Sequence, residues 1–110
     1  MGALPGKVYE LIIGPQNEWL LSAASLAEMA VKNSIAKLDL PAGETLRALR
    51  GLQVRVLPFE SSHAFAMFSL PLHHRDPFDR MILATALAER LPIVTGDRVF
   101  RRYADVKVIW

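Results

Sequence analysis

Short apolar runs alternate with amphipathic stretches along this chain. The runs that predict buried strands cover residues 19–23, 54–57, 91–95 and 106–110. Helical spacing predicts helices at 25–32, 43–50, 62–70 and 77–90, with Gly51 as the stop of the second helix and a short helical turn at 97–103. Because strands separated by helices are typical of βα units, we expect an α/β fold: a three-layer α/β/α arrangement around a parallel sheet.

Length and composition bound the class of protein. The chain has 110 residues, so we expect one domain over 1–110 that buries a core without covalent staples. It has no cysteine, which excludes disulfides and thiolate metal sites and is compatible with a reducing cytosol, so we expect a cytoplasmic protein. No apolar run is long enough to span a membrane, and the first residues do not form a secretory signal.

The net charge of +2 does not by itself indicate nucleic-acid binding. Basic residues do gather late in the chain, around Arg75, Arg98 and Arg102. Such clusters are often only a solvated face, and a phosphate-binding surface is the alternative.

Three acidic residues are placed where helices meet the carboxyl ends of strands. Glu28 lies on the helix after the first strand, Asp79 opens the helix before the third strand, and Asp97 follows that strand. Each has a structural alternative, because Glu28 could complete a capping box with Ser25 and the other two could serve helix starts or turns. Gathered carboxylates repel one another unless a cation compensates them, so together the three predict a site for Mg²⁺ or Mn²⁺.

Residues beside these acids also have two interpretations. Asp76, before Pro77, is a good N-cap or a member of the site, and Thr95 is a strand residue or a hydroxyl that orients a water or phosphate oxygen. We interpret His73 and His74 as loop residues with loose contacts, because two adjacent histidines without further histidine or cysteine do not build a zinc site.

The helix at 62–70 carries aromatic residues. Phe65 and Phe68 are three positions apart, so we predict that they form a stripe in the core rather than a binding face. His63, among alanine and phenylalanine, is expected to be a packed or a surface histidine.

Several segments resemble PIN domains, and in particular the VapC-like toxins. LSAASLAEMAVK at 21–32 resembles the segment that carries their second acidic residue, LHHRDPFDRMILA at 72–84 the third, and VTGD at 94–97 the fourth. The closing strand at 106–110 is also similar, and the segments occur in the family's order from about residue 8 to the end.

The resemblance implies a Mg²⁺- or Mn²⁺-dependent endoribonuclease, the toxin half of a toxin–antitoxin pair, with RNA and an antitoxin protein as partners and a homodimer as its assembly. Carried over by position, the catalytic metal ligands are Glu28, Asp79 and Asp97, with Thr95 as an accompanying catalytic hydroxyl. RNA phosphates would meet the exposed arginines of the late basic cluster, which are Arg75, Arg98 and Arg102.

The first acidic residue of the family has no counterpart here. PIN domains begin with a central apolar strand that ends in aspartate, whereas no aspartate precedes Asp39 in this sequence. The gene product is shortened, or another chain supplies the strand, or the segments 19–23 and 91–95 pair directly. Unpaired edges favour association, so we expect a dimer or a larger assembly. Two functions stay open: an active ribonuclease, or a catalytically impaired module that binds an antitoxin or another protein.

Overall fold

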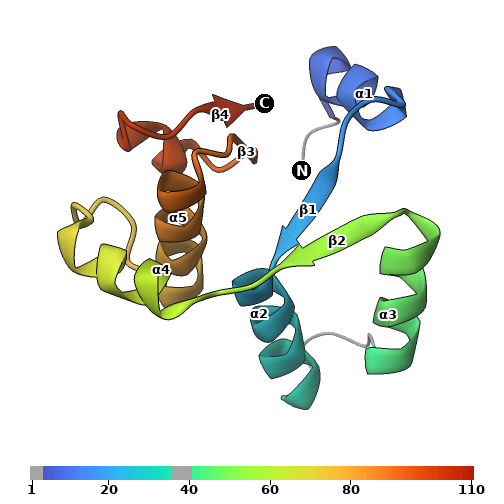
Figure 1. Ribbon diagram of the computed structural model, residues 1–110, viewed down its shortest axis with the longest axis horizontal. Helices are drawn as coiled ribbons and strands as arrows, with labels where there is room; N and C mark the ends of the chain where they lie inside the picture. The colour runs from blue at the N-terminus through green and yellow to red at the C-terminus, as the bar shows by residue number, and fades with distance from the viewer. Residues whose placement is uncertain (1–3, 36–40) are drawn as a thin grey trace.

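Helices and parallel strands alternate in the computed structural model, which describes residues 4–35 and 41–110 (Figure 1). The elements are α1 (Gly6–Ile13), β1 (Trp19–Ser22), α2 (Ala23–Ser34), α3 (Ala42–Gly51), β2 (Val54–Leu57), α4 (Ser61–Ala66), η1 (Met67–Ser69), α5 (Pro77–Glu89), β3 (Ile93–Val94), η2 (Arg98–Arg102) and β4 (Val108–Ile109). The predicted α/β class with parallel strands is confirmed. None of the helices in the described parts is long and apolar enough to cross a membrane.

The strands form two separate two-stranded sheets in the described residues. β1 pairs with β2 in the register Trp19↔Val54, and β3 pairs with β4 in the register Ile93↔Val108. Direct pairing between 19–23 and 91–95, one of the expected alternatives, is therefore wrong. Figure 1 shows β1 and β2 side by side, with β3 and β4 apart from them above the upper end of α5. The two halves are joined where α2 packs against α5.

The main core lies around α5. Leu83 of this helix is fully buried, and it clusters with Phe100, Tyr103 and Val106 from the end of the chain. The helix begins where the sequence predicts because Asp76 accepts a hydrogen bond from a first-turn N–H and Pro77 follows it. One element therefore supplies both the centre of the core and, at its first turn, Asp79.

Two predicted helix boundaries are wrong. α2 begins at Ala23, and the hydroxyl of Ser22 accepts the backbone N–H of Ala24, so the capping box of Ser25 with Glu28, one of the two alternatives for this glutamate, does not form. Gly51 lies inside α3 rather than beyond it, because Gln53 takes the left-handed conformation, with φ of 57°, that glycine was expected to supply.

The predicted core stripe on the fourth helix is also wrong. Phe65 and Phe68 are 72% and 88% exposed, and their rings stack on each other at a centroid distance of 6.3 Å. The reason is that α4 ends at Ala66 and continues as a 3₁₀ turn, so the helical spacing does not persist. His63 is buried instead, with Nδ1 accepting the backbone N–H of Glu60 and Nε2 at 3.0 Å from a carboxylate oxygen of Glu89.

Candidate metal centre

The structure brings Asp79 and Asp97 together around one histidine. The Nε2 atom of His74 lies 3.0 Å from Oδ2 of Asp79 and 3.0 Å from Oδ2 of Asp97. One nitrogen or oxygen from each of the three residues lies within 4.8 Å of the others. Asp79 comes from the first turn of α5, and Asp97 is the cap of η2, just after β3. His74 comes from the loop that joins η1 to α5.

His74 is held firmly, so the interpretation of loose contacts is wrong. The buried hydroxyl of Tyr103 accepts the backbone N–H groups of His73, at 3.2 Å, and His74, at 2.9 Å. The same hydroxyl donates to the carbonyl of Pro71 at 2.8 Å. The rings of His74 and Phe100 also meet in a T-shaped arrangement at a centroid distance of 5.4 Å. Residues from the end of the chain thus fix the loop that carries this histidine.

The hydrogen-bond network also assigns the tautomer of His74. Its Nδ1 atom accepts the backbone N–H of Asp76 at 3.3 Å, so the ring proton sits on Nε2. That Nε2–H faces both carboxylates. In this state the Nε2–H group of His74 is a hydrogen-bond donor shared by Asp79 and Asp97. Nε2 therefore has no lone pair directed at a metal ion.

The surroundings push the pKa values of the two aspartates in opposite directions. Burial raises the pKa of Asp79 above its usual range, the negative charges of Asp76, Glu28 and Asp97 raise it further, and His74 partly opposes the rise. The backbone N–H of Val99, at 3.0 Å, lowers the pKa of Asp97, and His74 lowers it further. Asp97 therefore ionises readily, whereas its surroundings do not fully offset the negative charge of ionised Asp79.

Glu28 lies outside the group of three. Its carboxylate pairs with Lys32 of the same helix at 3.6 Å. It is nevertheless close enough for its charge to raise the pKa of Asp79. The structure therefore places Glu28 near the aspartates without making it one of their direct neighbours.

The remaining predicted residues surround the cluster in different roles. Asp76 is the N-cap of α5, because its Oδ1 accepts the N–H of Asp79 at 3.0 Å. The hydroxyl of Thr95 accepts the N–H of Asp97 at 3.1 Å and so shapes the turn that presents this carboxylate. The three arginines named from the sequence are exposed, and two of them directly follow members of the cluster in the chain: Arg75, Arg98 and Arg102.

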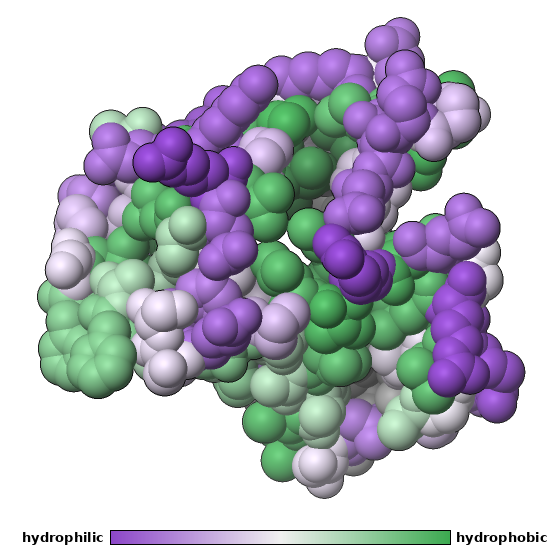
Figure 2. All heavy atoms as spheres, viewed as in Figure 1, coloured by the Kyte–Doolittle hydropathy of each residue, from purple (hydrophilic) through white to green (hydrophobic). Residues whose placement is uncertain are grey.

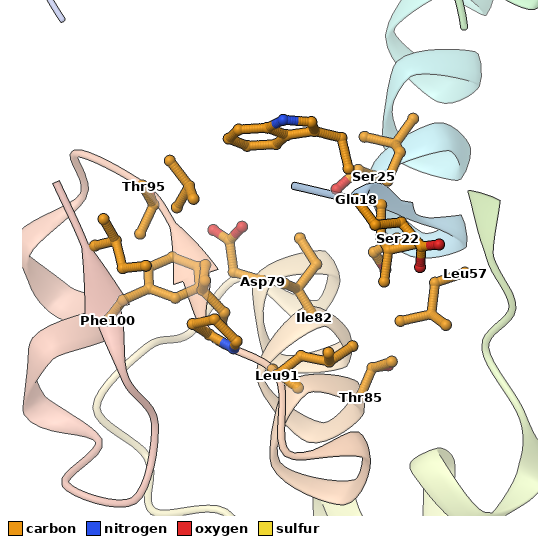
Figure 3. Close-up of a pocket in the computed structure, with 18 of the residues that line it drawn as sticks. Glu18, Ser22, Ser25, Leu57, Asp79, Ile82, Thr85, Leu91, Thr95 and Phe100 are labelled. Atoms are coloured by element: carbon orange, nitrogen blue, oxygen red, sulfur yellow. The ribbon is translucent and has the colours of Figure 1, made fainter. Parts of the chain in front are cut away.

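A cavity of about 680 Å³ opens beside the cluster. Asp79, Thr95 and Asp97 are among its lining residues. Figure 3 shows the carboxylate of Asp79 pointing into the space between Ser22 on one side and Thr95 on the other. Figure 2 shows hydrophobic residues gathered around the hollow at the centre of the molecule. The acids therefore stand at a mostly apolar cavity that is wide enough for a ligand.

A protein-family model and a solved structure show what the chain is similar to. The family model described as PIN domain matches residues 4–106. The crystal structure of VapBC2 from Rickettsia felis bound to a DNA fragment from their promoter contains a chain of similar structure, with a TM-score of 0.69. The two chains share 17% sequence identity, over 94% of this chain and 82% of that one, so this likeness concerns the fold. No curated protein matches the sequence.

Proposed function

Because the chain belongs to the PIN domain family, we propose that the cluster of His74, Asp79 and Asp97 is the metal centre of a VapC-like toxin endoribonuclease. The observation that carries the proposal is the convergence of two carboxylates on one point, where one of them has a raised pKa. A divalent cation would supply the compensation that ionised Asp79 lacks.

The donor set fits Mg²⁺ or Mn²⁺. The two aspartates offer carboxylate oxygens, the whole chain has no cysteine, and hard divalent cations prefer such oxygen ligands. Asp79 and Asp97 would hold the ion, and Glu28 would join them after leaving Lys32. When bound, the ion supplies charge stabilisation and an activated water.

The other residues of the centre act by position. His74 keeps the two aspartates converged, and Thr95 holds the turn of Asp97. The exposed arginines Arg75, Arg98 and Arg102 would bind RNA phosphates. The reaction is phosphodiester hydrolysis: a water oxygen bonds to phosphorus and releases a proton, the bond from phosphorus to the leaving oxygen breaks, and that oxygen takes up a proton.

We further propose an antitoxin protein as partner and a homodimer as the assembly. The structural neighbour is itself one chain of a VapBC complex, which supports a partner of this kind. The second candidate function is a catalytically impaired module that binds such a partner. It is favoured by the position of Glu28, which pairs with Lys32 outside the cluster.

Calorimetric titration with Mn²⁺, followed by an RNA cleavage assay, tests the proposal. We expect Mn²⁺ binding that Asp79→Asn and Asp97→Asn abolish and that Asp105→Asn, on an exposed acid elsewhere, preserves. Cleavage that requires Mn²⁺ and weakens with salt supports the nuclease. Binding of Mn²⁺ without cleavage supports the impaired module, and no binding of Mn²⁺ overturns the metal centre.

A further inference from the structure

One arginine of α5 is bonded to the backbone of a loop rather than to an acid. Arg80 directly follows Asp79 in α5, and its side chain is half-buried. Its guanidinium forms no ion pair with a carboxylate of the described residues. It donates instead to four backbone carbonyls: Nη1 to those of Pro71 at 3.1 Å and His74 at 3.4 Å, and Nη2 to those of Met67 and Leu70, both at 3.4 Å. These four hydrogen bonds all go to one segment, 67–74.

The four carbonyls belong to two successive pieces of backbone. Those of Met67 and Leu70 lie at the end of η1, and an arginine that caps the last carbonyls of a helix has a common structural role. The other two lie beyond η1, in the loop that leads to α5. The carbonyl of Pro71 also accepts the hydroxyl of Tyr103 at 2.8 Å. Capping of η1 alone therefore does not account for Arg80, because half of its hydrogen bonds hold the loop.

His74 is held through its backbone as well as through its ring. Its N–H donates to the hydroxyl of Tyr103 at 2.9 Å, and its carbonyl accepts Nη1 of Arg80. Its Nδ1 accepts a backbone N–H, and its Nε2–H faces the two aspartates of the cluster. A rotation of the peptide group after His74 would carry the ring away from these carboxylates. The contact with Arg80 opposes that rotation.

We infer that Arg80 is a positioning residue of the metal centre: it ties the loop of His74 to the start of the helix that carries Asp79, and so keeps the imidazole at the two aspartates. Its effect on metal binding and cleavage rests on the proposed function. Arginine suits this task because its planar fork presents several N–H donors in a fixed geometry, so two nitrogens serve two pairs of carbonyls. A lysine would keep the charge, but its single nitrogen cannot face both pairs.

Nitrogen NMR of the imidazoles in metal-free protein tests the positioning directly. The chain has three histidines, and the variant His74→Gln identifies the signals of His74. In EDTA at pH 8 we expect the native chain to show His74 with its proton fixed on Nε2, and Arg80→Lys to show a mixture of the two tautomers. Buried His63, which is bonded elsewhere, should keep its signals in both proteins.

Titration with Mn²⁺ and RNA cleavage measure the consequence for the centre. Arg80→Lys should raise the dissociation constant for Mn²⁺ about tenfold and lower kcat about tenfold at saturating Mn²⁺, because groups that orient metal ligands have effects of this size. The KM for RNA should stay unchanged, whereas loss of an arginine that binds RNA phosphates would raise it. The matched control is Arg50→Lys, on an exposed arginine of α3, and it should change none of these quantities.

The tautomer measurement separates this inference from the proposed function. A native chain that binds no Mn²⁺ would overturn the metal centre, and the signals of His74 would then decide alone whether Arg80 holds the loop. Unchanged His74 signals in Arg80→Lys would overturn the inference. So would equal disturbance of His63 and His74, since Arg80 would then support the fold as a whole. If Arg80→Lys does not fold, the native chain decides: we expect separate Nη signals for Arg80, and one averaged signal would overturn the inference.

Discussion

Replacing Asp79 by asparagine should change stability in opposite directions with and without metal. The ligand atoms of Asp79 and Asp97 lie within 4.8 Å, and two unit charges at that distance repel by about 3.5 kcal/mol at an effective dielectric constant of about 20, or about 1 kcal/mol in water. The side chains are 24% and 42% exposed and His74 spans them, so the lower value applies. In EDTA at pH 7 we therefore expect Asp79→Asn to be more stable by about 1 kcal/mol, with a melting temperature about 4 °C higher.

With Mn²⁺ the native chain should instead be more stable than Asp79→Asn. At about 100 times its dissociation constant, an ion that binds only the folded state adds about 2.7 kcal/mol, and the native chain gains this whereas the variant does not. The pH dependence follows from the raised pKa of Asp79: the folded state takes up a proton more readily than the unfolded state, so ionisation costs stability above the folded pKa. The advantage of the variant in EDTA should thus disappear as the pH falls through the raised pKa toward 3.8 and below.

Thermal unfolding in EDTA and in Mn²⁺, from pH 3 to pH 8, measures both effects, with Asp105→Asn as the surface control. A variant that is less stable than the native chain in EDTA would refute the repulsion argument. An equal gain in Mn²⁺ for both proteins would refute the role of Asp79 as a ligand.

Three further substitutions test how the cluster and its surroundings are held. Tyr103→Phe leaves two N–H groups and a carbonyl without their partner, so it should lower the free energy of unfolding in urea by about 1–3 kcal/mol; an unchanged midpoint would contradict this. Gly96→Ala would place a methyl group 2.8 Å from the indole of Trp110, so we expect a loss of about 1–3 kcal/mol that a second change, Trp110→Ala, relieves; additive losses would count against the clash. His63→Phe removes the cap of Glu60 and the contact with Glu89, and should cost about 1–2 kcal/mol by thermal unfolding, whereas exposed Phe65→Ala should cost little.

The order of elements could be predicted from the sequence because the apolar runs are short and well separated. The start of α5 was predictable to the residue because Asp76 and Pro77 are strong local signals. Dependence on such local signals also explains the predictions that were wrong. Phe65 and Phe68 have helical spacing, but the helix ends between them, and Gln53 takes a conformation that is common for glycine. The helix α1, at Gly6–Ile13, was not predicted at all.

The residues of the candidate site were also predictable only in part. Asp79 and Asp97 could be proposed because each stands at a junction of helix and strand, and parallel topology brings such junctions to one edge. His74 could not, because its position depends on Tyr103, which is 29 residues away in the sequence. The one local signal was its place two residues before the capping Asp76, whose N–H fixes its tautomer.

The hydroxyl of Tyr103 has a consequence for how the centre forms during folding. It tethers the backbone of His73 and His74 across about 30 residues of sequence. Such distant contacts form only after the intervening chain has closed into a loop, and this closure costs conformational entropy. The cluster is therefore expected to assemble together with the core around Phe100 and Tyr103, and to come apart when that core opens.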